Sequence, residues 1–254
     1  MSNSVIIGFV LAFLMGCGDE TQSTIEIESV YAEDPGDQSR TLTFMYLHGY
    51  SGSGLINIDT LKDLGLFAGI EDQVRIVVPQ VKATSLNPSN AWFPFLTYPW
   101  SETFGPLANR ADLETAASVL DPLLKREASF YSGSYEKIII MGFSQGGMMA
   151  SWLGLMSGRK YAGILNYEGC FPLFEVDRVS TIGETMEVYN LYDQEDVVVR
   201  KEFVDAGFQA AVQAGATAYR LDDSIHVSNR DDHHGFDAGS VNIIRRWLLP
   251  KVNR

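Results

Sequence analysis

One serine of this chain stands where its hydroxyl could act as a nucleophile. Ser144 is the middle residue of the pentapeptide GFSQG at positions 142–146, which has the form G-x-S-x-G. An apolar run rich in β-branched residues precedes it at 138–141, and a helix-like segment follows at 147–153. A strand, a tight turn and a helix form the context in which this motif projects the serine oxygen out of a sheet. The alternative is a Gly-rich turn with an incidental serine, and the flanking segments favour the nucleophile.

A serine hydroxyl needs a base within hydrogen-bond reach, and the base needs a carboxylate that orients it. The acid candidates follow a strand-like segment at 187–192: they are Asp193, Glu195 and Asp196. We prefer Asp196 because it directly precedes the apolar run 197–199 and the helix expected beyond that run. The alternative is an ordinary acidic turn, since spacing alone does not choose among neighbouring carboxylates.

The base candidates are three histidines that follow the acid along the chain: His226, His233 and His234. His226 lies close to an expected strand, where a packed histidine is the more typical interpretation. We choose His234 over His233 because Gly235 follows it and leaves the imidazole room to lean toward the nucleophile. His233 is then expected to cap or to hydrogen-bond locally.

A second Gly-rich stretch, HGYSGSG at 48–54, directly follows the strand expected at 41–47. Such a loop can expose backbone N–H groups, and two preorganised N–H donors would stabilise the oxyanion that develops during acyl transfer. The natural pair is the N–H of Gln145, next to the nucleophile, and the N–H of Tyr50. We interpret His48 as a residue that makes a structural hydrogen bond within the loop.

The segment 82–109 contains four prolines and six closely spaced aromatic residues: Trp92, Phe93, Phe95, Tyr98, Trp100 and Phe104. A loop of this length in a compact domain is usually functional. Its rings could line an acyl pocket or form a lid, and we take Trp92, Phe93 and Phe95 as substrate-binding residues. The alternative, a hydrophobic cluster that pins a long connection, stays open.

Strand-like and helix-like segments alternate along the chain. Strands are expected at 41–47, 74–78, 138–141, 161–167, 187–192 and 218–221, with Pro79 closing the second and a first edge strand possible at 25–30. Helices are expected at 55–66, 111–129, 201–214 and 241–249, and Pro122 should bend or split the second of these. This alternation predicts an α/β fold with a mostly parallel sheet and helices on both faces.

The charge and the cysteine content of the chain indicate which partners, metals and disulfides to expect. The chain has 254 residues and a net charge of −13, with a pI near 4.7, which argues against nucleic acid and anionic membrane surfaces as partners. No Cys-x-x-Cys or His-x-x-x-His spacing suggests a metal, and nothing in the sequence calls for a cofactor. A structural disulfide is not expected from Cys17 and Cys170, and Cys170 is interpreted as a buried apolar residue.

The first residues resemble an export signal. The run 5–15 is apolar and uncharged, and it is too short to span a bilayer comfortably. Leu14-Met15-Gly16-Cys17 resembles a bacterial lipobox, so Cys17 could be acylated and attach an exported protein to a membrane. An uncleaved anchor and a plain secretory signal are the alternatives. We therefore expect a leader at 1–17, a polar tether at 18–40 and a catalytic domain at 41–254.

The motifs taken together are similar to those of one family of small hydrolases. The segments that carry the resemblance are Leu47-His48-Gly49, Ala91-Trp92-Phe93, GFSQGG at 142–147, Cys170-Phe171-Pro172-Leu173, Asp196-Val197-Val198-Val199, and His234 before the last helix. In this order they resemble the carboxylesterase, lysophospholipase and acyl-protein thioesterase group of α/β-hydrolases, over about residues 40–250.

The resemblance implies an α/β-hydrolase fold, a triad of Ser144, Asp196 and His234, and hydrolysis of esters or thioesters with short to moderate acyl chains. We expect an exported serine carboxylesterase that acts on small-molecule esters. A thioesterase or lysophospholipase is the alternative enzyme. A hydrolase-fold binding protein without activity is the non-enzymatic alternative.

Overall fold

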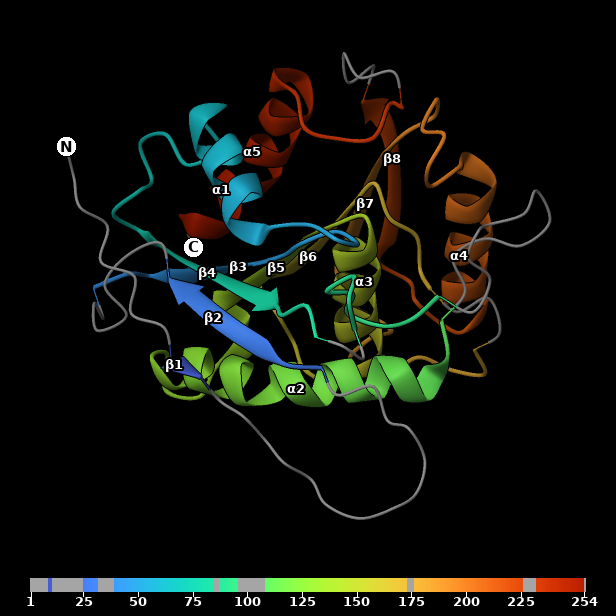
Figure 1. The fold of residues 1–254 in the computed structure, drawn as a ribbon, viewed down its shortest axis with the longest axis horizontal. Helices are drawn as coiled ribbons and strands as arrows, with labels where there is room; N and C mark the ends of the chain where they lie inside the picture. Colours follow the sequence, from blue (N-terminus) through green and yellow to red (C-terminus); the bar gives the residue numbers. More distant parts are fainter. Residues whose placement is uncertain are drawn as a thin grey trace.

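The central sheet passes through the whole molecule (Figure 1). We used a computed structural model, which describes residues 9–10, 25–31, 39–84, 87–95, 108–172, 176–225 and 232–253. Within these residues the sheet has eight strands in the order β1-β2-β4-β3-β5-β6-β7-β8. The strands are β1 (Phe9–Val10), β2 (Ile27–Tyr31), β3 (Leu42–Leu47), β4 (Val74–Val81), β5 (Ile138–Phe143), β6 (Gly163–Tyr167), β7 (Val188–Asp193) and β8 (Tyr219–Ile225).

Neighbouring strands pair in parallel along the six-strand stretch β4-β3-β5-β6-β7-β8. At the other end of the sheet, β2 runs antiparallel to β4, and β1 runs antiparallel to β2. Every residue of β3 and β6 is buried. Parallel strands that are covered on both faces have nearly continuous apolar sequences, and the central strands of this sheet do as well. The predicted α/β class with a mostly parallel sheet is confirmed.

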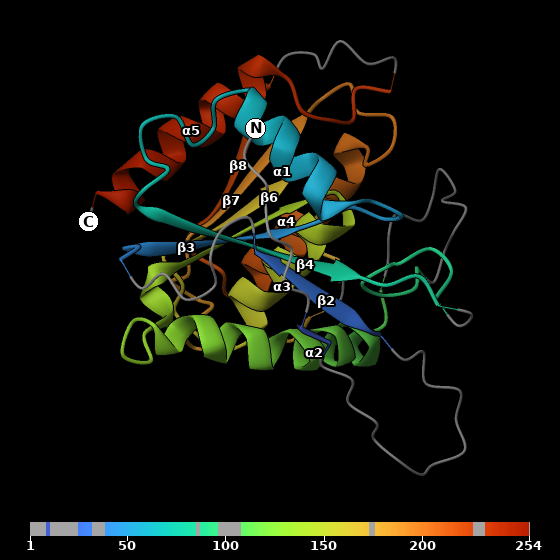
Figure 2. The same ribbon diagram turned by 60° about the vertical axis from the view of Figure 1, so that its left-hand side comes forward.

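Helices cover the two faces of the sheet. They are α1 (Gly54–Asp63), α2 (Arg110–Ser129), α3 (Gln145–Met156), α4 (Lys201–Gln213) and α5 (Ala238–Val252), with a 3-10 turn at Tyr135–Lys137. The buried side chains of α2, α3 and α4 belong to one hydrophobic cluster, and those of α1 and α5 belong to a second on the opposite face. Figure 2 shows α2 on one side of the sheet and α1 with α5 on the other.

Two prolines behave differently from the sequence-based expectation. Pro79 does not close its strand, because β4 continues to Val81. The pairing of β4 with β3 ends at Val77, and Pro79 lies beyond it, opposite Ser29 of β2; a proline is tolerated where the ladder does not need its missing N–H. Pro122 does not split its helix, because α2 is assigned continuously from Arg110 to Ser129 and is anchored by buried leucines on both sides of the proline.

The sheet begins earlier than the predicted catalytic domain. The strand expected near 25–30 is β2, which lies within the stretch interpreted as a tether and pairs along five residues of β4. Among the described helices, none is long and apolar enough to cross a membrane. Several residues singled out from the sequence lie outside the described part of the chain: Cys17, Tyr98, Trp100, Phe104 and His226.

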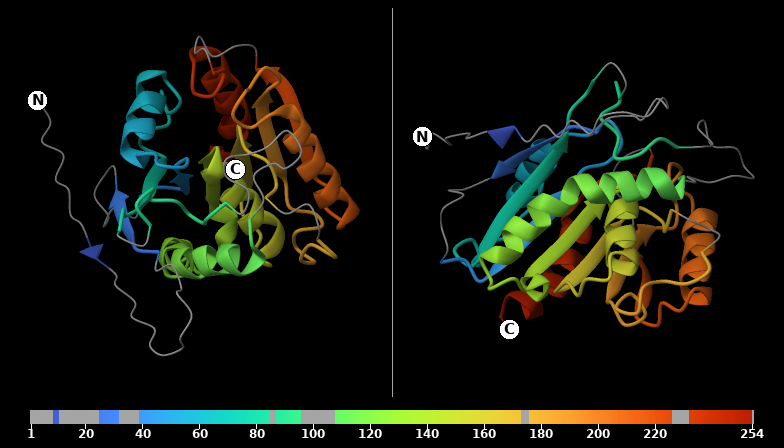
Figure 3. Two further views of the ribbon diagram at one scale, coloured as in Figure 1. Left: turned by 45° about the vertical axis from the view of Figure 1, so that its right-hand side comes forward. Right: turned by 90° about the horizontal axis from the view of Figure 1, so that it is seen from below.

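The parallel strands bring distant segments to one edge of the sheet. The carboxyl ends of β3, β5, β6 and β7 lead into the segments that begin at His48, Ser144, Glu168 and Gln194. In open α/β sheets, ligands bind in the crevice outside the carboxyl ends of the strands. Figure 3 shows these central strands side by side, with their ends facing the same way.

Candidate active site

Ser144 occupies the turn between β5 and α3 in a strained backbone conformation. Its φ is +53° and its ψ is −119°, a combination that residues with a Cβ rarely adopt. The turn is tied to the next strand by the Ser144 N–H, which donates to the Tyr167 carbonyl at 2.8 Å. A Cβ on Gly142 would lie 2.0 Å from the Gly146 carbonyl oxygen, and one on Gly146 would lie 2.1 Å from the Leu47 carbonyl oxygen. Glycine is therefore required on both sides of the serine.

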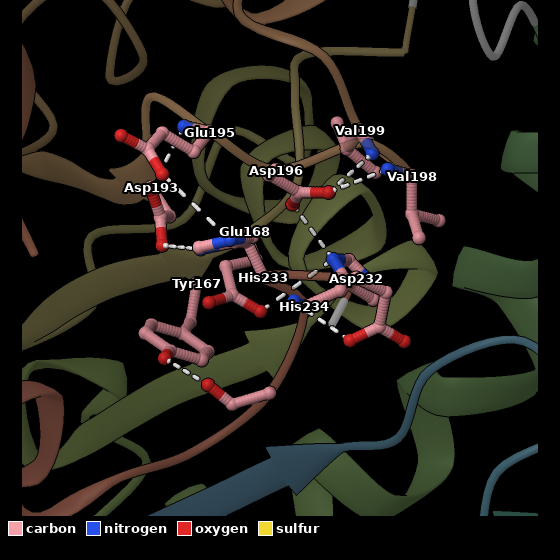
Figure 4. Close-up of polar contacts among 11 residues, drawn as sticks. Tyr167, Glu168, Asp193, Glu195, Asp196, Val198, Val199, Asp232, His233 and His234 are labelled. Carbon is pink, nitrogen blue, oxygen red and sulfur yellow. Dashed lines mark hydrogen bonds and ion pairs between the residues drawn. The ribbon is translucent and has the colours of Figure 1, made fainter. Parts of the chain in front are cut away.

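The carboxylate of Asp196 orients His234. Its Oδ1 accepts hydrogen bonds from the backbone N–H groups of Val198 at 2.7 Å and Val199 at 2.9 Å. Its Oδ2 lies 2.7 Å from Nδ1 of His234, and a dashed line marks this contact in Figure 4. Because a carboxylate only accepts, this contact places the proton of a neutral imidazole on Nδ1 and leaves Nε2 as an acceptor.

The His234 ring is also held by its neighbours. It packs against the ring of Phe143 with a centroid distance of 4.8 Å. The backbone N–H of His234 donates to Asp232 Oδ1 at 3.2 Å. His233 turns elsewhere: its φ is +52°, and its ring nitrogens lie 3.4 Å from an Asp193 oxygen and 3.7 Å from a Glu195 oxygen. Of the two histidines, His234 is the one that lines a cavity together with Ser144.

That cavity has a volume of about 330 Å³. Its walls are mostly apolar or glycine, with Ser144 and His234 among its polar groups, and it is lined by Gly49, Tyr50, Gly52, Ser53, Ile56, Asn57, Phe95, Phe143, Ser144, Val198 and His234. Small-molecule sites are typically apolar clefts with a few convergent polar groups, and this volume is near the lower end of their range.

The loop after β3 is fastened to β4 through His48. Its Nδ1 lies 2.8 Å from the Gly49 carbonyl, and its Nε2 accepts from the Val81 N–H at 3.1 Å. Burial lowers the pKa of His48 to about 4, so the ring is neutral at neutral pH. His48 thus makes structural hydrogen bonds, as the sequence suggested, and helps to fix the position of Tyr50. The Tyr50 side chain is partly exposed and donates from its hydroxyl to Ser89 Oγ at 2.8 Å.

Gln145 contributes to the site through its backbone position. It is the first residue of α3, and the first N–H groups of a helix have no acceptor within that helix. Its buried side chain accepts from the Trp92 N–H at 3.0 Å and donates to the Phe93 carbonyl at 2.7 Å. The side chain therefore anchors the segment after β4 to the turn that carries Ser144.

The three aromatic residues expected to bind substrate lie in different surroundings. Trp92 and Phe93 are 0% and 1% exposed, belong to the hydrophobic core, and do not line the cavity. The Trp92 indole N–H instead donates to the His48 carbonyl at 2.8 Å. Phe95 does line the cavity and packs against Tyr50 with a centroid distance of 5.7 Å. Position therefore supports a substrate contact for Phe95 alone, while the other two rings support the loop.

Glu168 is a site residue that the sequence reasoning missed. It directly follows β6 and is completely buried beside His234, with its Oε2 3.5 Å from His234 Nδ1. The sequence offered one weak signal, because Glu168 is a charged residue placed immediately after an apolar strand-like segment. Cys170, by contrast, is a buried free thiol whose pKa is raised by burial, in keeping with its expected apolar role.

Glu168, Asp196 and His234 also form a group whose potential metal-ligand atoms lie within 4.8 Å of one another. Two ligands of a tetrahedral zinc ion at about 2 Å from the metal would lie roughly 3.3 Å apart. The 2.7 Å between Asp196 Oδ2 and His234 Nδ1 is instead a hydrogen-bond distance. The arrangement is that of a carboxylate hydrogen-bonded to an imidazole.

Comparison with known proteins identifies the family. The profile of the phospholipase/carboxylesterase family matches residues 32–226, well over half of the chain. The chain belongs to the phospholipase/carboxylesterase family. The matched range contains Ser144 and Asp196 and ends before His234. The family is one of hydrolases, so the expected relationship to esterases and thioesterases is confirmed.

The chain is also similar to individual proteins at low sequence identity. The chain is 22% identical over 221 residues to acyl-protein thioesterase 1 homolog 2 of Dictyostelium discoideum, which covers 84% of this chain and 95% of the relative. Esterase PE8 is 22% identical with a TM-score of 0.63, over 84% of this chain and 93% of its own. The Bacillus cereus carboxylesterase is 15% identical with a TM-score of 0.64, over 91% and 96%.

Proposed function

We propose that this protein is a serine carboxylesterase that hydrolyses short- to medium-chain carboxylic esters through an acyl-enzyme on Ser144. The observation that carries the proposal is the shared cavity of Ser144 and His234, in which Asp196 holds the histidine through a 2.7 Å hydrogen bond. Membership of a hydrolase family supports ester cleavage, and the strained turn at Ser144 is that of a nucleophile elbow.

The first half-reaction transfers the acyl group to the enzyme. Ser144 Oγ attacks the ester carbonyl while Nε2 of His234 accepts the serine proton. The Nδ1–H stays hydrogen-bonded to Asp196, which stabilises the imidazolium that forms. The carbonyl oxygen becomes an oxyanion, and the backbone N–H groups of Tyr50 and Gln145 are its donors. Losing one such donor raises the barrier by about 3 kcal/mol in comparable enzymes.

The second half-reaction releases the acid. It begins once the first half-reaction has ended, when His234 has given its proton to the departing alcohol and the ester bond has broken. A water molecule then gives a proton to Nε2 and attacks the acyl-enzyme, and the acid leaves as Ser144 regains its proton. Both half-reactions therefore use His234, Asp196 and the same two backbone N–H donors.

The test uses p-nitrophenyl esters and a fluorophosphonate probe. Ser144→Ala should lower kcat by a factor on the order of 10⁶, since removal of the nucleophile disables the whole group. The matched control is Ser118→Ala, which removes an exposed hydroxyl on α2 far along the chain from the site. Full activity in Ser144→Ala, or no probe labelling of the wild-type serine, would overturn the proposal and favour a non-catalytic binding protein.

A thioesterase is the second candidate, because the Dictyostelium relative carries that name. The cavity of about 330 Å³ is small, so we expect short acyl groups to fill it better than a palmitoyl chain does. We expect kcat/KM to fall from butyrate to octanoate p-nitrophenyl esters. A higher kcat/KM for a palmitoyl thioester or a lysophospholipid than for either ester would reverse the assignment.

We further propose that the protein is exported and that Cys17 is acylated, because residues 14–17 resemble a lipobox. Expression of the full chain in a bacterium with radioactive palmitate tests this. Label on the wild type but not on Cys17→Ser supports the proposal, and an unlabelled protein in the cytoplasmic fraction contradicts it.

A further inference from the structure

A second carboxyl group lies beside the acid and base of the proposed site. Glu168 follows β6 and is 0% exposed. Its φ is +49°, in the left-handed region that residues with a Cβ enter at an energetic cost. Its backbone N–H donates to the Leu191 carbonyl at 2.9 Å, which fixes this conformation against β7. The backbone thus holds the Glu168 side chain at the edge of the sheet where the parallel strands end.

The side chain of Glu168 is directed at the same nitrogen that Asp196 binds. Glu168 Oε2 lies 3.5 Å from His234 Nδ1, and Asp196 Oδ2 lies 2.7 Å from it. Figure 4 shows the two carboxyl groups approaching the ring from different elements. Within the described part of the chain, neither Glu168 oxygen makes a hydrogen bond of ordinary geometry, although the Tyr167 hydroxyl and the Gly235 backbone lie near enough to favour its ionised form. Buried polar groups are usually hydrogen-bonded, so this carboxyl group has unused acceptor capacity.

We propose that Glu168 is a second positioning carboxyl for His234, which accepts a hydrogen bond from Nδ1–H when Asp196 cannot. The proposal rests on the proposed serine mechanism and adds a residue to it. A shift of roughly half an ångström would bring Glu168 Oε2 within hydrogen-bond distance of Nδ1. Asp196 remains the first partner, because it is closer and its other oxygen is fixed by two backbone N–H groups.

The ionisation of Glu168 explains why Asp196, and not Glu168, is the first hydrogen-bond partner of His234. Burial raises the pKa of Glu168 well above its usual range, and the neighbouring carboxylate of Asp196 raises it further. The charge on Asp196 therefore disfavours the ionised form of Glu168. Removing the Asp196 charge lowers the energy needed to ionise Glu168, which can then release its proton to solvent and accept from Nδ1–H. The other titratable groups that face it are Asp193, Tyr46, Tyr167 and His234.

A double-mutant cycle tests the proposal. The four proteins are the full-length wild type, Asp196→Ala, Glu168→Gln and the double variant, assayed for kcat/KM on p-nitrophenyl butyrate. Glutamine has the shape of a neutral glutamic acid but cannot become a carboxylate. We expect Glu168→Gln to lower kcat/KM at least ten times more in the Asp196→Ala background than in the wild type. Equal factors in the two backgrounds would overturn the proposal, because contacting but independent groups give no coupling.

The pH profile separates a positioning role from a structural one. In Asp196→Ala, kcat/KM should rise with pH through the ionisation of Glu168, and this rise should disappear in the double variant. The matched control is Asp193→Asn in the Asp196→Ala background, since Asp193 is a buried carboxylate whose ring partner is His233 and not His234. Because the Asp193 charge also raises the pKa of Glu168, this variant should shift the rise to lower pH without removing it. An equal loss of the rise with Asp193→Asn would show a general charge effect and overturn the assignment.

A second readout does not depend on turnover. Nitrogen-15 NMR of the imidazole reports which ring nitrogen of His234 carries the proton and whether it is hydrogen-bonded. We expect the Nδ1–H signal of Asp196→Ala to be lost or to exchange rapidly with solvent when Glu168→Leu is added, because leucine, unlike glutamine, has no atom that can accept from Nδ1–H. Circular dichroism checks that both proteins are folded. An identical signal in both would refute the role of Glu168. A wild type with the signal but no ester hydrolysis would instead refute the proposed function.

Discussion

At the scale of single residues, Asp196 divides its two oxygens between two tasks. Oδ1 accepts from two backbone N–H groups, and Oδ2 accepts from His234. An asparagine at this position would keep its carbonyl oxygen on the backbone donors, because an NH₂ group cannot accept their hydrogen bonds. Its NH₂ would then face His234 Nδ1. The ring would be forced to carry its proton on Nε2, where it could not accept the Ser144 proton.

The first prediction follows from this tautomer. Asp196→Asn should lower kcat/KM by about 10⁴-fold, as loss of the correct tautomer does in a serine protease triad. It should be less active than Asp196→Ala, which leaves Nδ1 free to be approached by Glu168. Steady-state rates on p-nitrophenyl butyrate measure both. His233→Gln serves as the control, because that ring faces Asp193 and Glu195. An Asp196→Asn protein as active as Asp196→Ala would contradict this account.

The residues of the site were only partly predictable from the sequence. Ser144 lies in a recognisable local pattern, because the turn needs glycine at 142 and 146. A Cβ at these positions would come within 2.0 and 2.1 Å of backbone oxygens. Asp193 and Asp196 have no such pattern. They lie in one turn, in which the Asp196 N–H donates to the Asp193 carbonyl. In this turn Asp193 lies beside His233, and Asp196 lies beside His234. Glu168 was missed because a single charged residue after a strand is only a weak signal, and its role depends on which loops the sheet brings together.

At the scale of elements, the loop after β3 depends on a buried neutral histidine. The pKa of His48 is lowered to about 4 by burial, and its Nε2 must stay unprotonated to accept from the Val81 N–H. A histidine in the unfolded chain has a pKa near 6.5. The native state therefore resists protonation that the unfolded state accepts. The contribution of His48 to stability is complete above pH 6.5 and is lost as the pH falls toward 4.

The second prediction is a pH-dependent loss of stability that His48 causes. The free energy of unfolding in urea should fall by about 3 kcal/mol more in the wild type than in His48→Gln between pH 7.5 and pH 4. Comparing the two proteins cancels the titration of the many surface carboxylates. Parallel stability curves for the two proteins over this range would show that His48 is not held neutral.

The elements themselves were mostly predictable, because apolar runs and helical spacing determine them locally. The errors concern prolines. Whether Pro79 ends a strand depends on which partner strand needs its N–H, and that partner lies far away in the sequence. Whether Pro122 splits a helix depends on the buried leucines that hold both halves of α2 against the sheet. Both are effects of tertiary contacts, which a local pattern does not contain.

At the scale of the whole molecule, the parallel sheet is bordered by the antiparallel strand β2. This strand pairs with five residues of β4, and Ile25 and Ile27 pack against the main hydrophobic cluster. It lies before residue 32, where the family match begins. The alternation of strands and helices was enough to predict the fold class, but the composition of 18–40 suggested a tether. The strand belongs to the sheet because it covers an edge of β4 that would otherwise present unpaired N–H and C=O groups.

The third prediction compares two truncated chains. A chain that starts at residue 25 keeps β2, whereas one that starts at residue 41 lacks it. The longer form should unfold within about 2 °C of the full chain, and the shorter form about 5–10 °C lower, since in a domain of this size 1 kcal/mol shifts Tm by roughly 2–4 °C. The shorter form should also associate, because exposed edge strands pair with other chains. A third chain with residues 27–31 replaced by Gly and Ser tests whether pairing rather than length matters, by calorimetry and light scattering. If all three chains share one Tm and remain monomeric, β2 does not protect the β4 edge.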